Sequence, residues 1–76
     1  MTDMTRGELL ADLVSHGGMS QLIARLEGFD VQARLMALAM SAPWAMDDEV
    51  SFWFRPDGRG DIQIELERVR GGSIYG

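Results

Sequence analysis

The clearest structural pattern in the chain lies between Glu49 and Val69, in a stretch that reads EVSFWFR (49–55), PDGRG (56–60) and DIQIELERV (61–69). Apolar and polar residues alternate on both sides of a glycine-rich turn, which is the pattern of a β-hairpin with one buried face. We expect antiparallel strands at about 49–55 and 61–69. The inward face would carry Val50, Phe52, Phe54, Ile62, Ile64 and Leu66; the outward face would carry Ser51, Trp53, Gln63, Glu65 and Glu67.

Two registers of this hairpin agree with one-sided burial, because both place inward residues opposite inward residues. A three-residue loop, 56–58, suits a type I turn followed by a glycine bulge and puts Phe52 opposite Ile62. A five-residue loop, 56–60, puts Phe54 opposite Ile62 and improves apolar and charge matching between the strands. The cross-strand pairs slightly favour the five-residue loop, whereas the turn chemistry favours the shorter one.

The chain before the hairpin predicts three short helices, of which the first spans about 6–16. Thr5 and Glu8 have the spacing of a capping box, in which each side chain bonds to the backbone N–H of the other residue. Leucine and valine side chains follow at helical spacing. Gly17-Gly18 is expected to end this helix, because glycine readily adopts the left-handed conformation found at helix ends.

The second predicted helix, about 20–27, is short enough that it depends on tertiary packing for its stability. Ser20 is a candidate N-cap residue and Gly28 a candidate end. Its apolar residues at helical spacing are Leu22, Ile23 and Leu26. This spacing predicts that the three side chains pack together against the rest of the domain.

The third predicted helix, about 30–42, is the most apolar one. Asp30 is its candidate N-cap, and Pro43 stops it because proline cannot continue a helix. Between 35 and 42 only Ser41 is polar. A helix that is apolar nearly all round is normally buried on several sides. We therefore expect this helix to be the central element of the core.

The regular alternation of the second strand breaks after Glu67, since Arg68 takes an inward position and Val69 an outward one. The strand is expected to end or to bulge there. The pattern as a whole predicts a single small α+β domain over 1–70, followed by a flexible tail over 71–76.

Composition narrows the possible functions. The chain has 76 residues, no cysteine, one histidine, 12 acidic residues and seven arginines, for a net charge of −5. A domain of this size has a small core, and disulfides and thiolate metal sites are ruled out. The negative charge disfavours direct binding to nucleic acid.

No stretch has the roughly 18 apolar residues of a membrane span. The cytoplasm is the expected location.

Candidate residues for chemistry are few, and none predicts an enzyme or a cofactor. His16, beside two glycines, is better explained as a helix-end residue than as a general base. Asp47, Asp48 and Glu49 offer oxygen ligands, but three consecutive acids point in different directions and lack the spacing of a calcium loop. Because these acids repel one another, we expect all three to lie in solvent at the start of the hairpin. Glu65 and Glu67 lie on an exposed sheet face, where carboxylates keep ordinary proton affinities. We expect neither catalysis nor a bound metal.

The outward face of the hairpin is the best candidate for a binding site. Trp53 stands there among polar and acidic residues, and an exposed tryptophan in such surroundings is a common anchor of protein interfaces. The residues expected to bind a partner are Trp53, Glu65, Glu67, Asp47, Asp48 and Glu49. We predict a small acidic binding protein, an inhibitor or adaptor that docks on a basic, nucleic-acid-handling protein. Phage-encoded inhibitors of host defence have a similar size and charge, which is an analogy of scale only.

Two alternative functions are compatible with the same sequence. Three helices followed by a hairpin resemble a winged helix-turn-helix in element order, and such a DNA-binding regulator would use Arg34, Arg55 and Arg59. Against this, the third helix carries only Arg34 as a base. The other alternative is a homo-oligomeric structural subunit, for instance a homodimer joined through the methionine-rich third helix or the open edge of the hairpin.

Overall fold

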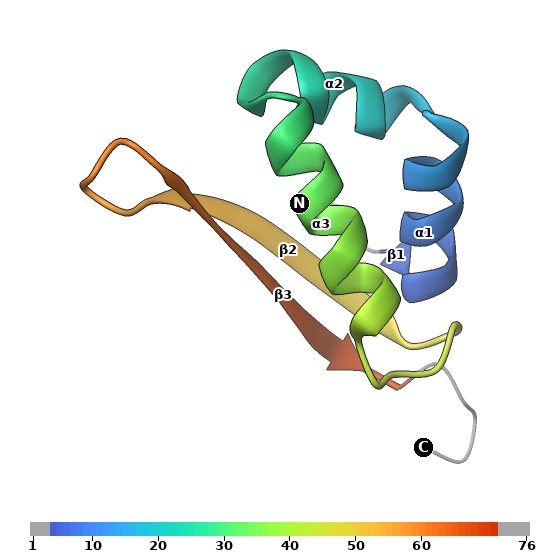
Figure 1. The fold of residues 1–76 in the computed structure, drawn as a ribbon. Coiled ribbons are helices and arrows are strands. Elements are labelled where there is room, and N and C mark those ends of the chain that lie inside the picture. The colour runs from blue at the N-terminus through green and yellow to red at the C-terminus, as the bar shows by residue number, and fades with distance from the viewer. Residues whose placement is uncertain (1–3, 72–76) are drawn as a thin grey trace.

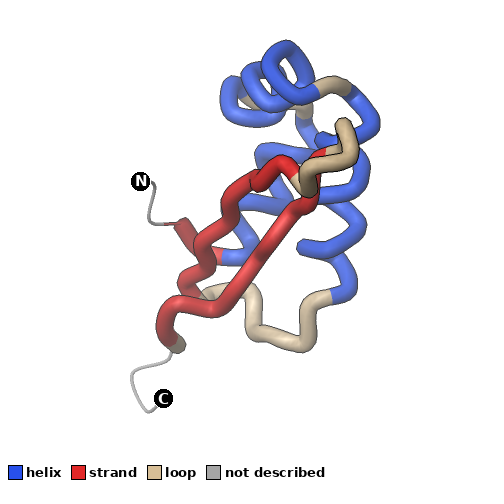
Figure 2. Tube along the Cα trace, turned by 90° about the vertical axis from the view of Figure 1, so that its left-hand side faces the viewer, coloured by secondary structure: helices blue, strands red, loops and turns tan. Residues whose placement is uncertain are grey.

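A computed structural model of the chain describes residues 4–71 (Figure 1). The elements are β1 (Met4–Thr5), α1 (Arg6–Ser15), α2 (Gly18–Glu27), α3 (Phe29–Ser41), β2 (Glu49–Pro56) and β3 (Ile62–Arg70). The predicted α+β order of three helices followed by an antiparallel hairpin is confirmed. Figure 2 shows the strands on one side of the molecule and the helices on the other. Of the predicted tail, only Gly71 lies within the described residues.

The sheet contains a third strand that the sequence does not predict. β1 pairs antiparallel with β2, so the order across the sheet is β1-β2-β3. A strand of two residues is too short to show an alternating pattern. Thr5 belongs to this strand and is also the N-cap of α1, where it forms the predicted capping box with Glu8.

The register of the hairpin differs from both predicted registers, although inward residues still face inward residues. Phe54 lies opposite Ile64 and Phe52 opposite Leu66, and the loop runs from 57 to 61. The cause is Asp57, whose Oδ1 accepts the backbone N–H groups of Arg59 at 2.7 Å and Asp61 at 3.2 Å. Because these bonds form the turn around Asp57, the loop begins one residue later than predicted and Pro56 belongs to β2.

The predicted break in alternation at Arg68 and Val69 is a β-bulge. Val50 lies opposite Arg68 but Glu49 lies opposite Arg70, which leaves Val69 as the extra residue of β3. Because the bulge accommodates this extra residue, the strand continues to Arg70 and Val69 faces solvent.

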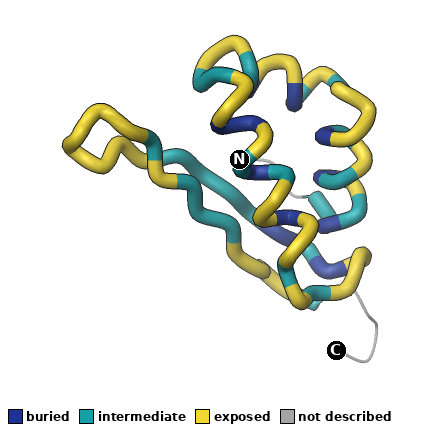
Figure 3. Tube along the Cα trace, in the orientation of Figure 1, coloured by how far each residue is buried: buried dark blue, intermediate teal, exposed yellow. Residues whose placement is uncertain are grey.

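The core forms where α3 packs against α1, α2 and β3 (Figure 3). Its buried apolar residues are Leu9, Leu13, Ile23, Val31, Leu35, Ala39 and Val50. The prediction of a central third helix therefore holds. As expected, α3 is buried on several sides, but its outer side is not covered, and Leu38 and Met40 are exposed there. The domain has too few other elements to cover that side.

Two of the predicted helix caps are not formed. Ser20 does not cap α2: it lies inside the helix, fully buried, and its backbone N–H donates to Asp12 Oδ1 at 2.7 Å. The N-cap position is Gly17. Asp30 does not cap α3 either, because that helix already begins at Phe29 with Gly28 as its N-cap.

The left-handed residue at the end of α1 is His16, with φ 55°, and not one of the two glycines. Gly17 instead has an extended backbone, and a Cβ there would lie 2.4 Å from Asp12 Oδ2. The glycine at 17 therefore makes room for the carboxylate that holds α2.

Gly28 joins α2 to α3 with φ 103° and ψ 158°, a conformation nearly restricted to glycine. We expect Gly28→Ala to lower the free energy of unfolding by about 1–3 kcal/mol, purely through backbone strain. Gly18→Ala is the matched control, since in both positions a new Cβ would have no atom within 4 Å. Gly18 is helical without a positive φ, so its replacement should be neutral or slightly stabilising. Equal urea denaturation curves for the two variants would refute this explanation.

Candidate functional site

Trp53 lies on the sheet face that points away from the helices, as predicted. Its indole Nε1 donates to Glu65 Oε2 at 2.7 Å from the directly opposite position on β3. Arg55 Nη2 approaches the same oxygen at 2.7 Å. Trp53 and Glu65 are half-buried, whereas Arg55 is exposed. One carboxylate oxygen thus fixes the orientation of the indole and holds a guanidinium next to it.

This pairing reduces the negative charge that the outer face offers to a partner. Glu65 is already bound to Arg55, and the exposed pair is weak enough to exchange with other ions. Glu67, on the same face, is exposed and forms no ion pair with any residue in 4–71. The free charge of this face therefore resides mainly on Glu67.

The predicted acidic cluster of Asp47, Asp48 and Glu49 is only partly available. Asp47 is exposed, but Asp48 is buried, with 8% of its surface accessible. Asp48 Oδ2 accepts the backbone N–H of Ala45 at 3.0 Å and lies 3.3 Å from Arg68 Nε. The expectation of a solvated triplet is wrong for Asp48, because its carboxylate folds back to close the turn before β2.

Glu49 also has a cationic neighbour: Arg70 reaches its two carboxylate oxygens at 2.8 and 3.1 Å. These contacts direct Asp48 and Glu49 toward different partners and not toward a common point. Within residues 4–71, no group of three or more histidine, aspartate or glutamate side chains is arranged to hold a metal ion.

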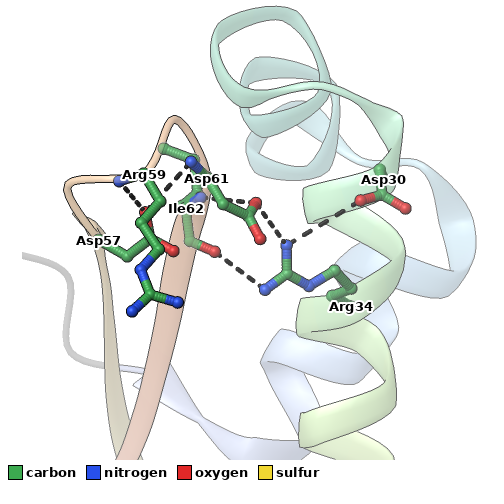
Figure 4. A network of polar contacts seen from close by, with 6 residues as sticks. All are labelled: Asp30, Arg34, Asp57, Arg59, Asp61 and Ile62. Carbon is green, nitrogen blue, oxygen red and sulfur yellow. Dashed lines mark hydrogen bonds and ion pairs between the residues drawn. The ribbon is translucent and has the colours of Figure 1, made fainter.

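Arg34 connects α3 to the hairpin tip (Figure 4). Its Nη2 donates to the backbone oxygen of Ile62 at 2.9 Å, and Nη1 lies 3.5 Å from Asp61 Oδ1 and 4.0 Å from Asp30 Oδ2. The only base of α3 thus serves to position the tip. The exposed residues of that helix are otherwise Ala33, Ala37, Leu38, Met40 and Ser41, together with Phe29 and Asp30 at its start.

The remaining tip arginines differ in their availability. Arg55 is paired with Glu65, as described above. Arg59 is exposed, and its guanidinium has no hydrogen-bond or ion-pair partner within residues 4–71. His16 is exposed at the end of α1, where its backbone oxygen accepts from Gln21 Nε2 at 2.8 Å. These positions do not bring the bases together into one cationic surface.

Arg6 was not predicted to have a structural role, although its side chain forms several hydrogen bonds to the backbone. It is buried, and it donates from Nε to Ala39 O at 2.7 Å, from Nη2 to Met40 O at 2.9 Å and from Nη1 to Trp44 O at 2.9 Å. The guanidinium thereby satisfies carbonyls at the end of α3. A signal was available: Arg6 precedes Leu9 and Leu13 by three and seven residues, which places it on the buried face of α1.

Two apolar surface features were also missed. Leu22, Leu26 and Phe29 are exposed where α2 meets α3, although the sequence predicted that the leucines pack inward. In addition, a groove of about 340 Å³ runs between α3 and β3, lined by Arg34, Ala37, Leu38, Gln63 and Ile64.

No protein-family model, curated protein or solved structure matches this chain. None of the helices within residues 4–71 combines the length and the apolar character needed to cross a lipid bilayer.

Proposed function

We propose that this chain is a non-enzymatic protein-binding domain, an inhibitor or adaptor, that docks the outer face of its sheet on a basic partner protein. The observation that supports this most strongly is the placement of Trp53, half-exposed on the side away from the helices and oriented by Glu65. Tryptophan buries a large area at small entropic cost, which makes it an effective interface anchor.

The neighbouring charges fit a cationic partner. The contact between Arg55 and Glu65 is solvent-accessible, so an arginine or lysine of the partner can replace Arg55 on the carboxylate. Glu67 adds a free carboxylate, and the net charge of −5 accelerates encounter with a basic surface.

The geometry favours a protein partner over DNA. A helix that enters the major groove presents polar and basic side chains, whereas the exposed side of α3 is largely alanine, leucine and methionine. Its single arginine is engaged with Asp61 and Ile62. Of the three arginines of the winged-helix alternative, only Arg59 remains without a partner within residues 4–71. No observation therefore favours the DNA-binding alternative.

The test begins with capture of partners from host-cell lysate, followed by titration of the purified partner. Trp53→Ala is expected to weaken binding about thirtyfold, which corresponds to about 2 kcal/mol for an interface anchor. Glu67→Gln should slow association and reduce its salt dependence. Ala11→Lys on α1 is the matched control, since it changes the net charge by the same amount at an exposed site on the helical side.

The same panel contains the results that would contradict the proposal. If Trp53→Ala and Glu67→Gln bind the partner as tightly as the native chain, the outer face is not the interface. If the native chain instead retards random duplex DNA at low salt, and Arg59→Ala abolishes this, the winged-helix alternative replaces the proposal.

A further inference from the structure

Of the predicted apolar stripe of α2, Ile23 is buried in the core, but the two leucines are not. Leu22 and Leu26 are 50% and 68% exposed, while the polar Ser20 of the same helix is fully buried. With 3.6 residues per turn, the centre of the apolar stripe lies roughly a quarter turn away from the buried side of the helix. An amphipathic helix normally turns its apolar stripe inward. The exposed leucines therefore need a physical explanation.

Specific polar contacts hold α2 in this rotation. The buried Ser20 donates its backbone N–H to Asp12 Oδ1, and its Oγ accepts a hydrogen bond from Nε2 of Gln32, which is also buried. Turning the leucines inward would break these bonds and leave buried polar groups without partners, which is costly. The outward orientation of Leu22 and Leu26 is thus a defined feature of the fold.

Phe29, the first residue of α3, is a third large apolar side chain exposed near the junction of α2 and α3. It is 77% exposed, and it follows Leu22 and Leu26 where the two helices meet. We call Leu22, Leu26 and Phe29 the corner patch. Figure 1 places the junction of α2 and α3 at one end of the helical layer, and Figure 3 colours much of the chain there as exposed. Three large apolar side chains exposed together are typical of an interaction site.

The charges beside the corner patch are complementary to each other. Arg25, in the last turn of α2, is exposed and forms no ion pair within residues 4–71. Asp30 follows Phe29, and its side chain is 89% exposed, with only a 4.0 Å contact to Arg34. A surface that carries one available cation and one available anion can pair with a copy of itself about a two-fold axis.

A pocket next to the patch completes this self-complementary arrangement. Gln21, Ala24, Arg25 and Phe29 line an open pocket of about 270 Å³. We propose that the corner patch is the contact between two copies of this chain. Around a two-fold axis, Phe29 of each copy enters the pocket of the other and Arg25 pairs with the partner copy's Asp30. This contact is separate from the outer sheet face, so either surface can function without the other.

A second copy is favoured over an unrelated protein because the same surface supplies the aromatic ring, the pocket of which that ring forms one wall, and both charges. The ring would also lie near Arg25 in the pocket, which allows a cation–π contact. A small domain with few buried apolar residues commonly gains stability by such pairing.

Sedimentation equilibrium of the purified chain tests the proposal at protein concentrations from about 1 μM to 1 mM. This range covers the dissociation constants of weak to moderate complexes. The average mass of the native chain should rise from 8.4 kDa toward twice that value. Phe29→Ala should weaken self-association about tenfold or more without altering the monomer's thermal unfolding, because the ring is an exposed anchor. Arg25→Glu and Asp30→Arg should each weaken it about tenfold through like-charge repulsion.

Mixing the two charge variants provides the sharpest test. Each of these variants, Arg25→Glu and Asp30→Arg, carries two like charges at the contact and therefore repels copies of itself. In the mixture, the introduced glutamate of one chain faces the introduced arginine of the other and the native Asp30 faces the native Arg25, so a heterodimer as tight as the native homodimer should form. The double variant should likewise dimerise. Arg59→Glu at the hairpin tip is the charge-matched control and should leave self-association unchanged. A native chain that stays monomeric at 1 mM, or a dimer that none of the corner variants weakens, would overturn the proposal.

Discussion

Replacing Arg6 by methionine is expected to lower the free energy of unfolding by about 3–5 kcal/mol, because three hydrogen bonds from a buried guanidinium to backbone carbonyls are lost. Three backbone oxygens, on Ala39, Met40 and Trp44, lose their donor in this variant. Burial of unpaired carbonyls is costly, and the end of α3 has no basic residue of its own to replace the guanidinium. A domain of this length has a total stability of about 4–11 kcal/mol, so this loss removes a large share of it.

Urea denaturation followed by circular dichroism measures this effect. Arg6→Lys should recover only part of the loss, because one ammonium group lacks the planar fork that reaches several carbonyls at once. Arg59→Met is the control, since Arg59 is exposed at the hairpin tip. A loss below about 1 kcal/mol for Arg6→Met, the range of ordinary surface substitutions, would show that the end of α3 does not depend on this arginine.

Replacing Leu35 by alanine is the second large effect, with an expected loss of about 3–4 kcal/mol from the cavity that it creates. Leu35 is fully buried in α3, the helix that packs against α1, α2 and β3. Leu38→Ala is the matched control: it removes the same atoms from the same helix, but Leu38 is 39% exposed. It should cost less than about 1.5 kcal/mol, because little packing is lost.

Thermal unfolding of the two alanine variants provides the comparison. The midpoint temperature should fall much further for Leu35→Ala than for Leu38→Ala, since a loss of 1 kcal/mol lowers the midpoint of a domain this small by about 4–8 °C. Equal midpoints would mean that α3 is not the centre of the core.

The sequence predicted the elements of this fold because their signals are local. Alternation at Val50, Phe52 and Phe54 specifies which face of the hairpin is buried without any knowledge of the helices. The same reasoning placed Trp53 on the outer face. The capping box between Thr5 and Glu8 was likewise predicted, because both partners lie within one turn.

The features that sequence reasoning missed depend on contacts between distant segments. Arg6 reaches carbonyls more than 30 positions along the chain. Asp12 binds the backbone of Ser20 and thereby determines the rotation of α2, which no periodicity in that helix indicates. Asp48 was assigned to an exposed cluster because its neighbours are acidic, whereas its burial follows from the turn at Ala45 and from Arg68 on β3.

Acrylamide quenching of Trp53 fluorescence, in a Trp44→Phe background that leaves a single tryptophan, tests the functional proposal most directly. The outer-face interface predicts that the indole is accessible to the quencher in the free chain and protected once the captured partner is bound. Quenching that is unchanged in the complex would show that the partner binds elsewhere, and it would contradict the assignment of Trp53 as the anchor of the interface.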